Sequence, residues 1–340
     1  MAEATITKAP ESISPIAERA QLRSVPHRAD LSIVIVTWNS ERWIERCLSS
    51  IPAACAGLEY EIVVYDNASS DGTMKLLDGS GGVQLLRGEA NDGFAAGANR
   101  ALAQSSGRYL FLLNPDCELE PSALTSLVAF LDAHPQAAAA APLLVDESGD
   151  SQREFQLRRL PSLRHLASEA LLLDKIVPQN RATAHYRYRD LDLTTPQRVE
   201  QPAAAALLIR REVVDEIGAF DEQFAPAWFE DVDYCQRLAS AKKEIYVVPS
   251  AVARHFGGAS LEHMPYGEFL DTWYRNMYLY ARKWFTRSEA EALRWAIIVG
   301  MMLRWIAALA GVRNGSSSRR AALRTYRAIM QKALNQWRTA

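Results

Sequence analysis

The chain has few cysteines, no apolar stretch in its first 30 residues and almost no net charge. Its four cysteines show no C-x-x-C spacing, so neither a zinc knuckle nor a disulfide framework is indicated, and a reducing cytoplasm fits. The first 30 residues mix charge, Pro and Ser without an apolar stretch, so they show no secretory signal, and we expect a flexible leader over 1–30. The 38 Lys+Arg nearly balance the 40 Asp+Glu, which argues against nucleic acid as a partner.

Two glycine-rich phosphate motifs are missing as well. No G-x-G-x-x-G follows the first predicted strand, and no G-x-x-x-x-G-K-[ST] occurs anywhere in the chain. Dinucleotide oxidoreductases and P-loop NTPases therefore lose their main sequence support. A phosphate group could still be held through a bound cation.

What is present is an ordinary globular composition with a regular alternation of patterns. The 340 residues, 49% of them hydrophobic, suffice for one large domain or two smaller ones. Strands separated by helices of 10–15 residues predict an α/β fold, with a mainly parallel, Rossmann-like sheet covered by helices on both faces. The predicted strands are 31–37, 60–66, 83–87, 108–114 and 137–145, and the helices between them are 40–51, 69–78, 93–105 and 122–134.

The second half of the chain is less regular. We expect an irregular insert over 146–200, a helix over 229–241, a strand over 244–249 and a loop over 251–260. After about 265 every pattern is helical. The predicted organisation is thus a leader (1–30), an α/β domain (31–262) and a basic helical extension (263–340).

Polar residues follow four successive predicted strands. In an open parallel sheet, ligands bind beyond the carboxyl ends of the strands, so we expect these residues to meet at one edge. Each could serve only as a turn or a cap, but their convergence favours a binding site. They are Thr37 and Asn39, then Asp66, Asn67 and Asp71, then Asn91, Asp92 and Gly93, and finally Asn114 and Asp116.

Two further groups could carry chemistry. Glu230, Asp231 and Asp233 stand at a predicted helix start, where acids also occur simply because of the helix dipole. Their aromatic neighbours suggest burial, which raises a carboxyl pKa and suits a general base. Asp116 is a natural oxygen ligand for Mg²⁺ or Mn²⁺. His255, followed by two glycines, could reach the same cation or simply be a loop histidine.

This set of motifs resembles glycosyltransferase family 2, the inverting enzymes with the GT-A fold, and within it the bacterial rhamnosyltransferase-like branch. The resemblance covers about 31–260 in the family's order and spacing. It is carried by SIVIVTWNSERWIERCLSSI, VVYDNASSDGT, NDGFAAGANRAL, YLFLLNPDCELEPSAL, GAFDEQFAPAWFEDVDYCQR and RHFGGAS.

The resemblance implies a metal-dependent transfer of a sugar from a nucleotide-sugar donor to a hydroxyl, with Mg²⁺ or Mn²⁺ as cofactor. By position, Asp231 matches the catalytic base, with Glu230 and Asp233 as neighbours that bind or orient the acceptor. The metal motif D-x-D appears as Asn114-Pro115-Asp116, which leaves Asp116 as the principal carboxylate ligand and His255 as a further one. The nucleotide-sugar site is expected to comprise Thr37, Asn39, Asp66, Asn67, Asp71, Gly93, Asn99, Asn114 and Asp116.

Within this branch the favoured donor is dTDP-rhamnose, and the expected product belongs to a cell-surface polysaccharide of the cell envelope. A UDP-hexose is the alternative donor, and a nucleotide-sugar-binding protein without activity is the alternative class. The presence of Asp231 in its full motif speaks against the latter. Donor choice depends on the 146–200 region, and the oligomeric state is left open.

The C-terminal helices raise the question of a membrane. Segment 295–311 is apolar but only 17 residues long and contains Arg304, which favours a core or interfacial helix over a spanning one. The last helix is basic on one side and apolar on the other, as in helices on membrane surfaces or helices packed on a domain. If it binds anionic lipid, the acceptor is a lipid-linked saccharide at the inner face of the cytoplasmic membrane. Its basic face comprises Arg313, Arg320, Arg324 and Arg327.

Overall fold

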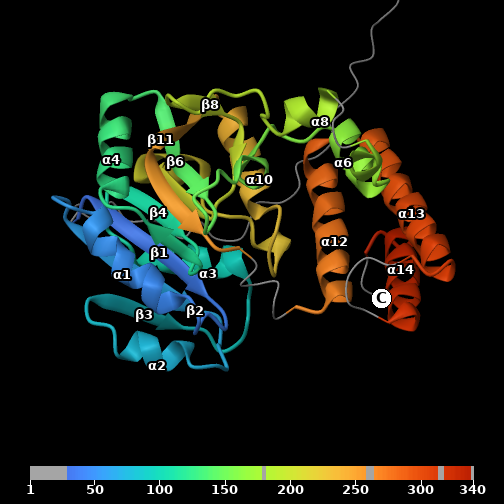
Figure 1. Cartoon of the computed structure of the whole chain (residues 1–340), viewed down its shortest axis with the longest axis horizontal. Coiled ribbons are helices and arrows are strands. Elements are labelled where there is room, and N and C mark those ends of the chain that lie inside the picture. The colour runs from blue at the N-terminus through green and yellow to red at the C-terminus, as the bar shows by residue number, and fades with distance from the viewer. Residues whose placement is uncertain (1–28, 178–180, 258–263, 313–317, 338–340) are drawn as a thin grey trace, which may run out of the picture.

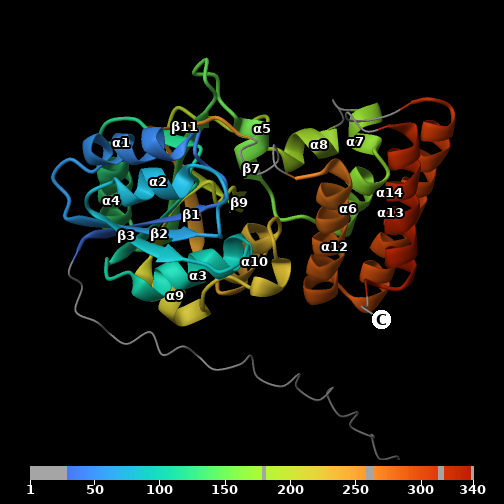
Figure 2. The same ribbon diagram turned by 90° about the horizontal axis from the view of Figure 1, so that it is seen from below.

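A central mixed sheet with helices on both faces forms the larger part of the molecule (Figures 1 and 2). The computed structural model describes residues 29–177, 181–257, 264–312 and 318–337. Residues 1–28 of the leader predicted over 1–30, and Arg313, lie outside these residues, whereas Asp30 is described and pairs with Arg108 at 3.1 Å. The strand order is β3-β2-β1-β4-β10-β6-β11-β5, with β8 paired to β11. The strands are β1 Leu31–Thr37, β2 Tyr60–Asp66, β3 Val83–Arg87, β4 Tyr109–Leu113, β5 Cys117–Leu119, β6 Ala137–Val145, β8 Gln197–Val199, β10 Ala206–Arg210 and β11 Glu244–His255.

The pairing confirms the predicted α/β class. Strands β3, β2, β1 and β4 are parallel, as are β6 and β11, while β10 runs antiparallel between β4 and β6. Strand β1 is buried along its whole length, as expected for a continuous apolar run inside a sheet covered on both faces.

Helices cover the two faces of the sheet and enclose two apolar cores. The first core is formed with α1 (Ile44–Ala54), α2 (Thr73–Asp78) and α4 (Ala123–Ala133). The second is formed with α3 (Phe94–Gln104), α9 (Arg211–Ile217) and α10 (Glu230–Ser240). The expected helices on both faces are therefore confirmed.

Two predicted segments differ from the structure. The loop expected over 251–260 is wrong in its first half, because β11 continues to His255 through a register shift against β6, and the residues from 258 on are not described. The expected irregular insert contains short elements that its mixed composition did not reveal. These are α5 Arg153–Gln156, β7 Leu157–Arg158, α6 Leu163–Ala170, α7 Leu173–Ile176, α8 Arg181–Tyr186 and β9 Gln201–Pro202, of which β7 and β9 form a small second sheet.

Three long helices stand together beside the sheet and share a third core. They are α12 (Tyr266–Trp284), α13 (Arg287–Leu309) and α14 (Arg319–Leu334), with α6 against α13 (Figures 1 and 2). The third core also contains Phe229 and Val232 from the start of α10. The helical extension is therefore packed directly against the segment that carries the acidic motif.

Candidate active site

The carboxyl ends of β1 and β2 bring the first predicted site residues together. Thr37 and Asp66 are register partners, and the Thr37 hydroxyl donates to Asp66 Oδ1 at 3.0 Å. Asp66 also accepts from the Ser69 backbone N–H at 2.9 Å and is only 1% exposed. Its carboxylate therefore holds the β2–α2 loop in one shape, as a preorganised wall requires.

Asn39 and Asp71 extend this wall into the β2–α2 loop. Asn39 adopts a left-handed conformation with φ of 50°, and its Oδ1 accepts from the Ser70 backbone N–H at 2.8 Å. Asp71 accepts from the Thr73 hydroxyl at 2.6 Å and from the Glu41 backbone N–H at 3.1 Å. Partial burial opposes ionisation of Asp71, but these hydrogen bonds outweigh it and lower its pKa. The loop is thus held both by Asn39, which follows β1, and by its own Asp71.

The β3–α3 turn connects the edge to the loop before α10. Asn67 donates to the Gly93 carbonyl at 3.2 Å. Gly93 has a φ of 92°, and a Cβ there would lie 2.5 Å from the carbonyl oxygen of Pro226, so this close backbone approach requires glycine. The side-chain amide of Asn99 accepts from the Phe220 backbone N–H at 2.9 Å and donates to the Phe220 carbonyl at 2.9 Å. In this structure Asn99 ties α3 to the 220 segment.

A buried carboxylate and a buried imidazole face each other where β5 and β11 pair. Asp116 Oδ1 lies 3.6 Å from His255 Nε2, and the two residues are 5% and 4% exposed. The Gln152 amide nitrogen donates to the His255 carbonyl at 2.7 Å, so its oxygen faces His255 Nδ1 at 2.9 Å and must accept from it. This fixes the tautomer, and the lone pair of Nε2 points toward Asp116.

The pair is suited to a divalent cation. Burial lowers the pKa of His255 and the Asp116 carboxylate opposes that effect, so the imidazole is held neutral, as a metal ligand must be. The Cys117 thiol also lies within 4.8 Å of both groups, but burial, with Asp116 adding to it, raises its pKa well above the ordinary value. One carboxylate oxygen and one imidazole nitrogen remain, a donor set that Mn²⁺ and Mg²⁺ accept. Asn114, at the end of β4, is half-buried beside them.

The start of α10 holds two carboxyl groups whose pKa values burial raises, and one of them has an oxygen without a partner among the described residues. Glu230 is 7% exposed, and its Oε2 has no hydrogen-bond partner among the described residues. Burial, with the Asp231 charge adding to it, raises the pKa of Glu230 well above the ordinary value. Asp231 is half-buried and accepts from the Val232 backbone N–H at 2.8 Å and from the Gln201 amide at 3.4 Å. Burial raises its pKa despite these hydrogen bonds.

Asp233 has a different environment from its two neighbours. It is fully buried, and its carboxylate accepts from Trp284 Nε1 at 2.8 Å and pairs with Lys283 at 2.8 Å and Arg237 at 3.1 Å. Lys283 and Trp284 belong to the end of α12. With its oxygens bound in this way, Asp233 anchors α10 to α12, an orienting role within the motif.

A second contact from α12 holds the loop that leads into α10. Asn276 is fully buried, and its amide nitrogen faces the backbone carbonyls of Phe224, Ala227 and Trp228 at 2.7, 2.9 and 3.0 Å. Trp228 is in the left-handed region with φ of 70°, a conformation that costs a non-glycine residue energy. Figures 1 and 2 show α10 between the sheet and α12.

Several of these residues carry no sequence signal. Gln152 lies in the irregular segment, Gln201 begins the two-residue strand β9, and Asn276 falls within an ordinary helical pattern. Only a buried polar position inside the apolar face of 266–284 could have pointed to Asn276.

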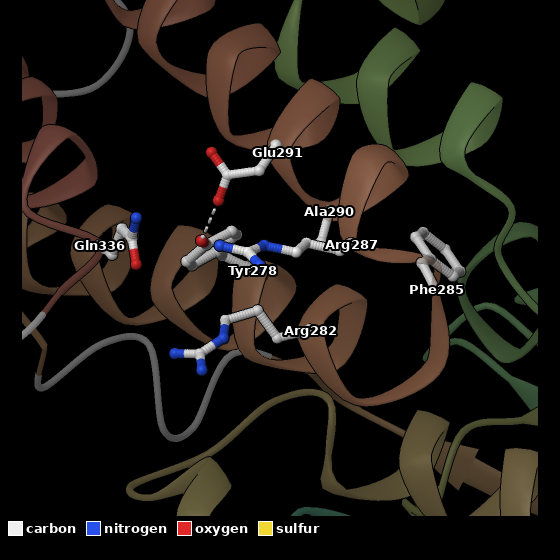
Figure 3. Close-up of a pocket in the computed structure, with 7 residues that line it drawn as sticks. All are labelled: Tyr278, Arg282, Phe285, Arg287, Ala290, Glu291 and Gln336. Carbon is white, nitrogen blue, oxygen red and sulfur yellow. Dashed lines mark hydrogen bonds between the residues drawn. The ribbon is translucent and has the colours of Figure 1, made fainter. Parts of the chain in front are cut away.

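The structure also contains a separate pocket of about 320 Å³ at the end of α12 (Figure 3). Tyr278 on its wall donates to Glu291 at 3.1 Å. None of the predicted site residues lines this pocket, so it is distinct from the group of residues described above. Its lining consists of Tyr278, Arg282, Phe285, Arg287, Ala290, Glu291 and Gln336.

Comparison with known proteins identifies the family. The profile described as Glycosyl transferase family 2 matches residues 32–218, more than half of the chain. The protein belongs to glycosyl transferase family 2. The predicted family and the enzyme class, a glycosyltransferase, are therefore confirmed; members of this family typically invert the anomeric centre.

Two curated relatives and two solved structures agree with this assignment. The chain is 28% identical over 286 residues to the N-acetylglucosaminyl-diphospho-decaprenol L-rhamnosyltransferase of Mycobacterium tuberculosis, covering 81% of this chain and 91% of the relative. It is 23% identical over 231 residues to the rhamnosyltransferase WbbL of Escherichia coli, covering 66% and 82%. The fold is similar to that of a mannosyltransferase from Pyrobaculum calidifontis in complex with GDP-Man and Mn²⁺ (TM-score 0.50, 18% identity, 91% and 85% covered). It is also similar to GalNAc-T7 with UDP, GalNAc and Mn²⁺ (TM-score 0.52, 15% identity), of which the chain spans 56% while 90% of the chain is covered.

Proposed function

We propose that this glycosyltransferase moves L-rhamnose from dTDP-rhamnose to a hydroxyl of a lipid-linked saccharide in the synthesis of a cell-surface polysaccharide. The observation that carries the proposal is the similarity over 81% of the chain to a protein named as a rhamnosyltransferase that acts on a diphospho-decaprenol saccharide. A second relative is also named a rhamnosyltransferase. The working place would be cytoplasmic, at the inner face of the membrane that holds such an acceptor.

The proposed site residues divide into a donor wall and an acceptor side. The donor wall comprises Thr37, Asn39, Asp66, Asn67, Asp71 and Gly93, with Asn114 and Asp116 next to it; Asn99 supports the wall through Phe220. Asp116 and His255 would hold a divalent ion, which when bound neutralises the departing diphosphate. Both solved neighbours named above were obtained with Mn²⁺.

Asp231 would act as the general base. When the bond between the sugar anomeric carbon and the diphosphate breaks, positive charge develops on the ring. The Asp231 carboxylate takes the proton of the acceptor hydroxyl, the hydroxyl oxygen bonds to the anomeric carbon, and the bonding electrons leave with the diphosphate. The raised pKa of Asp231 makes it a stronger proton acceptor than an exposed carboxylate. One base and one displacement invert the anomeric configuration.

A calorimetric screen of nucleotide sugars tests the donor. The purified chain is titrated with dTDP-rhamnose, UDP-glucose and UDP-N-acetylglucosamine, each with Mn²⁺, with Mg²⁺ and with EDTA. We expect dTDP-rhamnose to bind most tightly and its affinity to fall in EDTA. Tighter binding of a UDP-sugar would refute the rhamnose donor and would support a hexose donor in the same mechanism.

A further inference from the structure

The outward face of α13 is an unusual surface for a protein in water. Trp295, Val299, Met302, Ile306 and Leu309 follow one another at helical spacing and are each between 38% and 52% exposed. At 1.5 Å per residue they form a stripe about 21 Å long. Together with Leu303, which is 48% exposed, these residues are the outer face of α13. Contiguous apolar surface of this kind marks a site that something else covers.

The opposite face of α13 holds the helix to the protein. Its side chains are buried in the third core, and two arginines on this side are bonded within the chain. Arg304 donates to the Ala170 carbonyl of α6 at 2.7 Å and to the Tyr274 hydroxyl of α12 at 2.8 Å, and Arg294 donates to the Ala333 carbonyl of α14 at 3.3 Å. By length and composition α13 is the one helix of the described residues that could cross a membrane. These contacts keep it against α6, α12 and α14, so only the outer face is free.

The sequence of α14 allows its apolar side to face either lipid or the protein, and in the structure that side packs on the protein. The apolar side of α14 is buried, with Ile329 at 1% and Ala333 at 0% exposure. Its basic side is outward, and Arg320, Arg324 and Arg327 are exposed and form no salt bridge with any described residue. The apolar side of α14 therefore packs on the protein, and its basic side faces away from it. These three residues are the arginine flank.

The arginine flank begins beside the outer face of α13. Arg319, the first residue of α14, donates to the backbone carbonyl of Leu309, the last residue of the apolar stripe. Figures 1 and 2 show α13 and α14 together at the end of the molecule farthest from the sheet. Residues 282–340 contain 12 Lys+Arg and 2 Asp+Glu, a net charge of +10. Apolar and basic surface thus occur together at this end.

We propose that the outer face of α13 lies in the surface of an anionic bilayer, with the arginine flank against the lipid headgroups. An apolar helix face with tryptophan and neighbouring arginines is the chemistry that binds the boundary between headgroups and acyl chains. This proposal rests on the proposed function, because a lipid-linked acceptor would be presented at such a surface. Helix α12 contacts α13, the loop before α10 and α10 itself. The part of the molecule that binds the bilayer is therefore packed against the helix that contains the proposed base, Asp231.

Vesicle flotation with the full-length chain tests the proposal without donor, acceptor or turnover. We expect the chain to float with vesicles of phosphatidylglycerol and phosphatidylcholine and to remain unbound with phosphatidylcholine alone. Met302→Gln/Ile306→Gln should lower the bound fraction at least about tenfold, because two apolar side chains that the bilayer would bury are replaced by polar ones. Leu334→Gln, at a residue 50% exposed on α14, is the matched control and should float like the unmodified chain.

A second pair of variants tests the charge. Arg320→Glu/Arg324→Glu should abolish flotation at physiological salt, whereas Lys75→Glu/Lys242→Glu, with the same change of net charge on the α/β domain, should retain it. Circular dichroism melts of all variants check that each is folded. Equal flotation of the α13 variant, or equal binding to neutral vesicles, would overturn the proposal.

Sedimentation velocity separates the lipid from a second copy of the chain. A dimer that Met302→Gln/Ile306→Gln makes monomeric, with vesicle binding unaffected, would show that another protomer covers the face and would overturn the proposal. Donor calorimetry on the same samples is independent. If the chain floats as expected but does not bind dTDP-rhamnose more tightly than the UDP-sugars, the rhamnose donor is refuted and the membrane proposal stands.

Discussion

The two polar parts of the site differ in how far their groups are satisfied. At the end of β1 and β2, Thr37, Asp66 and Asp71 are bonded to neighbouring hydroxyls and backbone N–H groups. At the start of α10, Glu230 has a buried oxygen without a partner among the described residues, and burial raises the pKa of Asp231 although it accepts from the Val232 backbone N–H at 2.8 Å and from the Gln201 amide at 3.4 Å. The first region is held in one shape by its own hydrogen bonds, as the proposed donor wall requires. The second holds carboxyl groups whose pKa burial raises, as the proposed base requires.

The largest effect should come from removing the base. Asp231→Asn should lower the transfer rate by roughly 10²–10⁴-fold, because the amide cannot accept the acceptor proton. The donor wall is untouched, so the donor dissociation constant should stay within about twofold by calorimetry. Asp215→Asn, the same change at an exposed position on α9, serves as the control. If the variant kept more than about a tenth of the rate, the activation barrier would have risen by less than ~1.4 kcal/mol. Asp231 would then not be the base.

The next effect concerns the cation ligands. Asp116→Ala should abolish the part of the nucleotide affinity that depends on Mn²⁺ or Mg²⁺, because His255 alone is a weak site. Titrations with metal and with EDTA should then give the same affinity. Glu120→Gln, an acid on the surface near Arg254, should leave the metal dependence intact. If Asp116→Ala retained a metal-dependent affinity, Asp116 would not be the ligand.

A third effect connects the helical extension to the α10 side. Asn276→Ala removes the amide nitrogen that faces three backbone carbonyls, of which the Phe224 carbonyl is the buried one, at about 1–3 kcal/mol for a carbonyl that water does not reach. We expect a lower melting temperature and a kcat that falls more than the donor affinity, because the loop before Asp231 loosens while the donor wall does not. Asn335→Ala, at an exposed position on the same bundle, is the control. Equal losses in kcat and donor affinity would contradict a selective role.

The smallest effect should appear in stability as a function of pH. Because the folded pKa of Glu230 lies above its ordinary value, the stability that Glu230 contributes is present at low pH and is lost as pH rises through the raised pKa. Glu230→Gln cannot ionise, so it should melt higher than the unmodified chain at pH 8, by roughly 2–4 °C per kcal/mol. The two curves should converge toward pH 4. A constant gap across this range would refute the buried charge.

The fold, and the places of the main acids in it, were predictable because they depend on local patterns. Continuous apolar strands and the alternation with helices lead directly to a parallel sheet, and Asp66, Asp116 and Asp231 follow from motif positions. The division between Glu230, Asp231 and Asp233 was not predictable. Three acids within four residues read alike in sequence, and only the approach of Lys283 and Trp284 shows that the third is an anchor.

The C-terminal helices illustrate the same limit. The amphipathic pattern of α14 is identical for a helix on lipid and a helix on protein, and burial of Ile329 decides between them. Conversely, α13 is apolar nearly all round, so its sequence cannot tell which side is outward. The partners of Gln152 and Asn276 are backbone carbonyls far away in the chain, which leave no mark on residue patterns.

The anomeric configuration of the product tests the central claim most directly, because a donor wall with a single separate base allows only one displacement. Transfer from dTDP-rhamnose to a water-soluble analogue of the lipid-linked acceptor can be followed by nuclear magnetic resonance of the anomeric proton and carbon. The account predicts a product of the configuration opposite to that of the donor. Retention of configuration would require a second displacement and a nucleophile, and would contradict Asp231 as the sole base.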